Sequence, residues 1–163
     1  MIKFQNVFFS YSDGDSSIKD ITFSIKSGEC VVLCGKSGSG KSTILRTISG
    51  LIPVFYEGEL KGKVEIDKQI PAELDSEERA NLFGVVFQDP RSQFFTMESD
   101  TEISFGLENK GLTHEEIKKR TKEAFSKFGL EYLENREVFK LSSGERQLIA
   151  VMAAWAMNTE IIL

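Results

Sequence analysis

Residues 35–43 read Gly35-Lys36-Ser37-Gly38-Ser39-Gly40-Lys41-Ser42-Thr43 and fit the pattern G-x-x-x-x-G-K-[ST]. The apolar run Cys30-Val31-Val32-Leu33-Cys34 precedes them and is typical of a strand that is buried on both faces. Residues 41–49 then have the pattern of a helix, and Gly50 stands at its C-terminal end. A glycine-rich loop between a buried strand and a helix predicts a phosphate-binding loop in an α/β protein.

The chemistry of this loop follows from its residue types. Glycines let the backbone curl so that successive N–H groups point inward, and the N-terminus of the following helix adds a partial positive charge. We therefore expect the loop to bind a polyphosphate, with Lys41 reaching the β- and γ-phosphates and Ser42 ligating Mg²⁺. The candidate binding residues are Gly35, Ser37, Gly38, Ser39, Gly40, Lys41, Ser42 and Thr43.

The composition excludes several classes of protein. The 163 residues, of which 40% are hydrophobic and 28% charged, are enough for one globular domain. A formal net charge of −5 has the wrong sign for binding nucleic acid through phosphate neutralisation, so we expect no nucleic-acid partner. No apolar signal core opens the chain, and residues 147–159, the longest uncharged run, are too few to span a membrane. These features favour a cytosolic protein, or one that a partner holds at a membrane.

The order of elements along the chain can be read from its apolar spacing. Residues 2–9 and 18–25 alternate and predict strands, 58–66 resembles a further strand, and 84–88 and 161–163 are expected to be buried strands. From about residue 89 the chain becomes helical. Capping boxes are predicted at Asp75/Glu78, Ser99/Glu102, Thr113/Glu116 and Ser142/Glu145. Cys30 and Cys34 are expected to be small buried side chains, because a strand separates their Cα atoms by about 13 Å, which is too far for a disulfide.

A second motif narrows the class of nucleotide-binding protein to which this loop could belong. The guanine-reading pattern Asn-Lys-x-Asp is absent from the sequence, which disfavours GTP. Residues 141–147, Leu-Ser-Ser-Gly-Glu-Arg-Gln, resemble the signature motif of ATP-binding-cassette (ABC) ATPases, with Ser143 and Glu145 departing from the usual Leu-Ser-Gly-Gly-Gln. Tyr11, Gln88 and the strand at residues 62–67 match the family pattern in order, although Lys68 stands where the family usually has Gly.

The resemblance implies a P-loop NTPase ABC-cassette fold with an antiparallel β subdomain and a helical subdomain. It divides the chain into residues 1–88 (β subdomain and P-loop core), 89–140 (helical subdomain) and 141–163 (signature helix and the start of the Walker B strand). It implies ATP and Mg²⁺ as ligands. In the family the residue matching Tyr11 stacks on adenine, and the residue matching Gln88 approaches Mg²⁺ and the attacking water. Ser142, Ser143, Gly144 and Glu145 are expected to bind the nucleotide held by a second ATPase subunit, so the family also implies a homodimer or heterodimer.

Residues 87–95 and 103–109 are similar to the ATPase subunits of energy-coupling-factor (ECF) importers, which take up vitamins or metal ions. This resemblance implies a peripheral protein on the cytoplasmic face of the cell membrane, with an integral membrane subunit docking near residues 88–97. Phe94, Phe95 and Met97 are candidates for that docking surface. Packing between the two lobes of the protein is the equally weighted alternative for these side chains.

Several family residues do not occur within the chain. An Asp, a Glu and a His are expected after the strand at residues 161–163, whereas His114 precedes the signature motif. We therefore expect an N-terminal portion of a cassette, truncated at the Walker B strand, and predict that it is poorly stable and has little or no ATPase activity by itself. The alternatives are a catalytically inactive ATP-binding remnant, a soluble non-transport ABC ATPase and, least favoured, a P-loop kinase.

Overall fold

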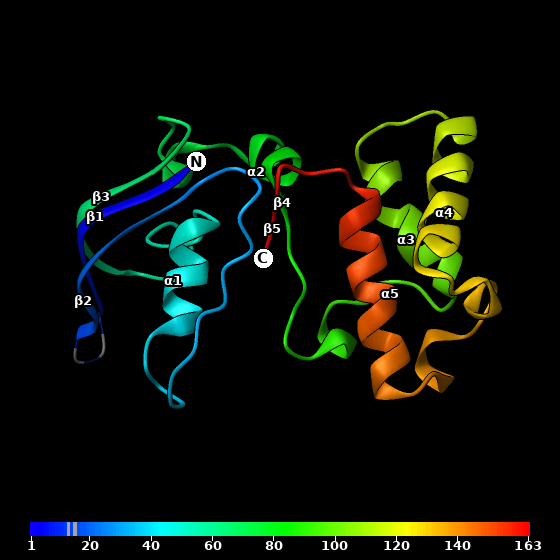
Figure 1. Ribbon diagram of the computed structural model, residues 1–163, viewed down its shortest axis with the longest axis horizontal. Helices are drawn as coiled ribbons and strands as arrows, with labels where there is room; N and C mark the ends of the chain where they lie inside the picture. The colour runs from blue at the N-terminus through cyan, green and yellow to red at the C-terminus, as the bar shows by residue number, and fades with distance from the viewer. Residues whose placement is uncertain (13, 15) are drawn as a thin grey trace. The chain divides into compact units, whose positions relative to one another are not determined.

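A computed structural model describes residues 1–12, 14 and 16–163, with mixed α and β content (Figure 1). The contacts divide the chain into two compact units, Met1–Arg79 and Ala80–Leu163. The boundary falls within helix α2 (Ser76–Leu82). The three-part division that the family resemblance implies stays a prediction.

An antiparallel sheet forms the first unit, in the order β2-β1-β3. Its strands are β1 (Ile2–Tyr11), β2 (Ser16–Ile25) and β3 (Gly58–Ile66), which confirms the strands expected at 2–9, 18–25 and 58–66. Phe4, Val7 and Phe9 of β1 are fully or almost fully buried, and the alternation of buried side chains shifts by one residue between Phe4 and Val7, where the pairing with β2 is irregular. This is the pattern of a sheet with one face on a core. The polar segment at residues 12–17, whose composition is typical of a turn, includes Asp13 and Asp15, which lie outside the described residues.

Helix α1 (Lys41–Ile48) contacts β2 and β3 and follows the glycine-rich loop, as predicted. Gly50 ends it with φ +70°, and a Cβ at this position would lie 2.1 Å from the carbonyl oxygen of Pro71. Pro71 opens the 3₁₀ helix η1 (Pro71–Glu73). Both the backbone conformation and the close approach therefore require glycine here.

The second unit is built around three helices, α3 (Ser99–Asn109), α4 (His114–Phe128) and α5 (Ser143–Ala156), which pack side by side (Figure 1). Short 3₁₀ turns η2 (Pro90–Ser92), η3 (Glu131–Leu133) and η4 (Val138–Lys140) connect the unit. Its core consists of fully or almost fully buried apolar side chains from all three helices and the turns, namely Ile103, Leu107, Ala124, Phe125, Leu133, Val138, Ile149, Met152 and Ala156.

A short parallel pair joins the two ends of the second unit. Strand β4 (Phe83–Gly84) pairs with β5 (Ile161–Ile162), and the Val86 N–H extends the ladder by donating to the carbonyl oxygen of Leu163 at 2.8 Å. The strand expected at 161–163 is therefore present. The strand expected at 84–88 is shorter than predicted, and Phe87 is 48% exposed.

The prediction of a buried strand at residues 30–34 was wrong. None of the described strands pairs with this segment, which has no regular secondary structure, and Val32 is 77% exposed. A central parallel strand is buried only when neighbouring strands and helices cover both its faces. Cys30 and Cys34 are accordingly free and exposed, so the expectation of small buried cysteines was also wrong.

Capping boxes fix the starts of three helices as predicted. Reciprocal hydrogen bonds join Asp75 with Glu78, Thr113 with Glu116 and Ser142 with Glu145. The box predicted at Ser99 and Glu102 was wrong, because Glu98 caps α3 without a side-chain bond. The Ser99 hydroxyl donates instead to the carbonyl oxygen of Leu133 at 2.5 Å, and long-range packing has replaced the local bond.

Candidate nucleotide-binding site

Lys41 occupies the centre of the glycine-rich loop. Its Nζ donates to the carbonyl oxygens of Gly35 at 2.9 Å and Lys36 at 2.8 Å, and reaches the Ser39 hydroxyl at 3.4 Å. All three acceptors are neutral, and among the described residues no carboxylate forms an ion pair with Lys41. The loop thus holds a cation whose charge no carboxylate pair neutralises, which is the electrostatic requirement for binding an anion.

The N-terminus of α1 adds to this positive potential. Its N-cap is Gly40, in the left-handed conformation with φ +85°, and no side chain caps the first turn. A Cβ at Gly40 would lie 2.7 Å from the carbonyl oxygen of Ser17, so the junction of loop and helix requires glycine. The first turn carries no acidic residue, and Ser42 is exposed there. Free N–H groups at a helix N-terminus bind anions.

Tyr11 is tied to the same helix. Its hydroxyl oxygen lies 3.2 Å from Thr43 Oγ1, which is buried, and accepts a hydrogen bond from Arg46 at 3.1 Å. The Tyr11 ring also contacts the Phe9 ring edge-to-face, with centroids 4.8 Å apart. The structure therefore places Tyr11, from β1, against the helix that follows the glycine-rich loop. Stacking of Tyr11 on adenine stays a prediction.

Gln88 belongs to the second unit and is exposed in the loop that follows β4. The side chain of Gln93 shapes this loop: it accepts from the Phe87 N–H at 2.8 Å and donates to the Val85 carbonyl oxygen at 3.0 Å. Asp89 caps η2 by accepting from the Arg91 N–H at 3.0 Å. Sequence reasoning did not assign Gln93 a role, although its amide can donate and accept hydrogen bonds at once.

Residues Ser142–Glu145 form the cap and first turn of α5. The Glu145 carboxylate accepts from the Ser142 N–H at 2.8 Å, and Ser142 Oγ accepts from the Glu145 N–H at 3.3 Å. The bond with the Ser142 side chain, and then that with its backbone, lowers the pKa of Glu145 below its usual range. Ser143 and Gly144 are exposed, and a Cβ at Gly144 would meet nothing within 4 Å. Nothing within the described chain therefore requires glycine at this position.

The donor set suits Mg²⁺ bound together with phosphate. Within residues 1–12, 14 and 16–163, no group of three or more His, Cys, Asp or Glu side chains could hold a metal by itself. The sequence-predicted ligands are the exposed Ser42 hydroxyl and the exposed Gln88 amide, both neutral oxygen donors. Mg²⁺ commonly takes few protein ligands and completes its shell with water and substrate phosphates, so each of these side chains, which belong to different units, is by itself of a type that suits the ion.

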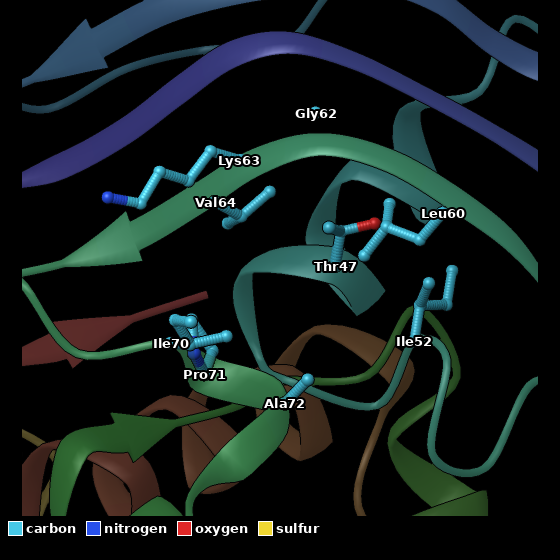
Figure 2. A pocket seen from close by; sticks show the side chains of 9 residues that line it. All are labelled: Thr47, Ile52, Leu60, Gly62, Lys63, Val64, Ile70, Pro71 and Ala72. Atoms are coloured by element: carbon cyan, nitrogen blue, oxygen red, sulfur yellow. The ribbon is translucent and has the colours of Figure 1, made fainter.

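The first unit also contains an apolar cavity, which the residues of the glycine-rich loop do not line (Figure 2). Side chains from α1, β3 and the segment around η1 line its volume of about 90 Å³. Ligand pockets commonly have volumes of about 300–1,000 Å³, so this cavity is too small for a nucleotide. Its lining includes Thr47 and Val64 but none of the sequence-predicted site residues.

The three docking candidates differ in their surroundings. Phe94 packs against the core of the helical unit, whereas Phe95 is 75% and Met97 61% exposed. The Phe95 ring stacks on that of Phe105, with centroids 5.0 Å apart. Phe95 and Met97 are thus an exposed apolar pair, and Phe94 contributes to packing within its own unit.

No helix of the described chain combines the length and the apolar character that crossing a membrane requires.

Comparisons with known proteins identify the family. Residues 18–163 match the family model described as ABC transporter. A Treponema denticola protein named as an ABC transporter ATP-binding protein is 41% identical over the whole chain, which covers 34% of that relative. The energy-coupling factor transporter ATP-binding protein EcfA1 of Streptococcus pneumoniae is 36% identical over the whole chain, which covers 58% of it. The chain thus spans about one third to three fifths of these relatives.

Solved structures agree with this assignment. CbiO1 from Clostridium perfringens, part of the ABC transporter complex CbiONQ, matches 99% of this chain and 63% of its own with a TM-score of 0.85 and 29% identity. A dimeric ATP-binding cassette in a post-hydrolysis state, bound to ADP and Pi, matches 99% of this chain and 72% of its own with a TM-score of 0.82 and 31% identity. The chain therefore belongs to the ABC transporter family and has the fold of its ATPase cassettes, whose members hydrolyse ATP.

Proposed function

We propose that this chain binds MgATP and that the protein to which it belongs hydrolyses ATP to drive an ECF-type importer. The observation that carries the proposal is the Lys41 ammonium, held by two loop carbonyl oxygens beside an uncapped helix N-terminus. Relatives named as ECF ATP-binding proteins support the importer class. The cargo is of the class that ECF importers carry, a vitamin or a metal ion.

Each loop residue has a defined part in this proposal. Lys41 exchanges its carbonyl partners for β- and γ-phosphate oxygens, and the N–H groups of residues 35–43 surround the same phosphates. Ser42 and Gln88 would each supply one oxygen ligand to Mg²⁺, and the bound ion would supply positive charge to the phosphates. Gln88 also orients the water that attacks the γ-phosphorus, with ADP as the leaving group. Tyr11 supports the adenine ring by stacking.

A second ATPase subunit completes the site. Residues 142–144 are exposed at the N-terminus of α5, and Gly144 leaves its backbone open to close approach. We propose that this segment faces the γ-phosphate bound to the other subunit. The relative solved as a dimer with ADP and Pi supports such a pair. The two subunits are copies of this protein or closely related chains.

The exposed pair Phe95 and Met97 is proposed to face the integral membrane subunit. Large apolar side chains that are 75% and 61% exposed favour an interface over solvent. Through this contact the protein would lie on the cytoplasmic face of the membrane as a peripheral subunit. Phe94 would act indirectly, by packing beneath the loop that carries the pair.

ATP binding tests the first part of the proposal. Lys41→Ala removes the central cation, and charge-assisted hydrogen bonds of about 1.5–3 kcal/mol predict a loss of affinity of about 10- to 100-fold. Isothermal titration of the purified protein with MgATP measures the loss. Lys36→Ala is the matched control, because it removes an equal charge from the same loop. Equal affinities of wild type and Lys41→Ala would refute ATP binding by this loop.

Association with the membrane subunit tests the second part. Phe95→Ser and Met97→Ser should weaken co-purification with an ECF transmembrane subunit, whereas Tyr132→Ser should leave it unchanged. Tyr132 is a suitable control because it is 59% exposed on another part of the same unit. Retention of the complex by the double variant Phe95→Ser/Met97→Ser would exclude this surface as the docking site.

A further inference from the structure

Arg46 of α1 contacts two aromatic side chains, Tyr11 of β1 and Tyr56 of the segment that follows α1. Its NH1 group donates to the Tyr11 hydroxyl at 3.1 Å, and its guanidinium carbon lies 4.1 Å from the centroid of the Tyr56 ring. A planar guanidinium can donate in its plane while its face stacks on an aromatic ring. Arg46 therefore makes both contacts without compromise between them.

The chain after α1 is folded so that Tyr56 lies over Arg46. The carbonyl oxygen of Arg46 accepts from the N–H groups of Leu51 at 2.9 Å and Ile52 at 3.2 Å. The Tyr56 N–H then donates to the Leu51 carbonyl oxygen at 3.2 Å. These backbone bonds anchor the segment that carries Tyr56 to the end of the helix.

Tyr11 is fixed from three directions. Its backbone pairs with Gly58 of β3, its ring meets the edge of Phe9, and its hydroxyl lies between Thr43 and Arg46. A phenol can donate one hydrogen bond and accept another, so the hydroxyl can donate to Thr43 while accepting from Arg46. The orientation of the ring thus depends on α1, the helix that also carries Lys41 and Ser42.

We propose that Arg46, held by Tyr56, is a positioning residue that orients the Tyr11 ring for the nucleotide base. This inference rests on the proposed function, in which Tyr11 stacks on adenine. Arg46 touches neither base nor phosphate in this role and acts through Tyr11. Its effect falls on the base alone, because the phosphates are bound by Lys41 and the loop N–H groups.

The test compares two ligands that differ by the nucleoside. Titrations of the purified protein with MgATP and with magnesium tripolyphosphate should show that Arg46→Met weakens ATP binding by about 3- to 10-fold, as loss of one hydrogen bond predicts. Tripolyphosphate affinity should stay within about twofold of wild type. Arg79→Met is the matched control, since Arg79 stacks on Phe55 at 5.6 Å in the same unit but does not contact Tyr11, and it should change neither affinity.

Tyr11→Phe removes the same hydrogen bond from the other end and keeps the ring, so it covers the case in which Arg46→Met fails to fold. It should reproduce the loss of affinity for ATP without a loss for tripolyphosphate. The double variant Tyr11→Phe/Arg46→Met should bind ATP no more weakly than either single variant. Equal losses for ATP and tripolyphosphate, or no loss for either, would overturn the positioning role. Lys41→Ala tests the proposed function separately. If this variant bound ATP and tripolyphosphate as tightly as wild type, the proposed nucleotide site itself would be refuted.

Discussion

The Glu102 carboxylate accepts a hydrogen bond from the backbone N–H of Thr96 at 2.8 Å. The same oxygen accepts from the Phe95 N–H at 3.0 Å and the Thr96 hydroxyl at 2.9 Å. Glu102 is 6% exposed, and within the described residues it forms no ion pair. One buried carboxylate thus shapes the loop that presents Phe95 and Met97.

Glu102→Gln should loosen this loop. The change removes the charge that strengthens three hydrogen bonds, and we expect a loss of about 1–3 kcal/mol in the free energy of unfolding. Urea denaturation measures it, and amide exchange at Phe95 and Thr96 should accelerate. Glu108→Gln, at an exposed site on the same helix, is the control and should lower the free energy of unfolding less, because its carboxylate accepts a single side-chain hydrogen bond, from Ser104 at 3.0 Å. Unchanged exchange at Thr96 would contradict the assigned role of Glu102.

Lys68→Gly should stabilise the protein. Asp67 and Lys68 both have positive φ, of 46° and 75°, in a tight turn closed by reciprocal bonds of 2.9 Å between Ile66 and Gln69. Turns of this type favour glycine, and relief of the strain should raise the free energy of unfolding by about 0.5–1 kcal/mol. Lys61→Gly, within β3, should lower it instead. A lower urea midpoint for Lys68→Gly would show that the turn is not strained.

Gly144→Ala should raise the stability of the protein and lower its ATP hydrolysis. The added Cβ meets open space and removes a glycine from the first turn of α5, so stability should rise by up to about 1 kcal/mol. ATP hydrolysis by the assembled protein should fall, because the methyl group obstructs the approach of the other subunit's nucleotide. Thermal melts and phosphate release measure the two effects. Full hydrolysis by this variant would argue against a close contact at Gly144.

Acid should release the cap of α5. Hydrogen bonds from Ser142 lower the pKa of Glu145 in the folded chain, so this carboxylate adds stability above its unfolded pKa. That contribution is lost as pH falls through the lower, folded value. Carboxyl NMR titration should find the pKa of Glu145 below its usual range, and Ser142→Ala should raise it.

The second capping box provides the control for this titration. The pKa of Glu116 is lowered in the same way, chiefly by the Thr113 side chain. Thr113→Ala should therefore raise the pKa of Glu116 and leave that of Glu145 unchanged. A pKa of Glu145 that does not respond to Ser142→Ala would mean that another group holds the carboxylate in its charged form.

Local patterns were predicted well and long-range contacts were not. The box of Thr113 and Glu116 involves residues three apart, and the sequence alone contains both partners. Ser99 and Glu102 have the same spacing, yet their bonds go to Leu133 and to the segment at residues 95–96. Spacing cannot reveal such competition, because the competing partners are brought close only by packing of the helical unit.

The sequence by itself determined the glycine-rich loop before α1, the antiparallel strands and the family, because these depend on residue types at short, fixed spacing. Tertiary structure decided how side chains distant in sequence meet, such as Arg46 with Tyr11 and Gln93 with Val85. It also left residues 30–32 and 34 exposed and Leu33 half-buried, although the apolar composition of the segment indicates burial. Apolar composition permits a buried strand, but burial itself depends on neighbouring strands and helices that cover it.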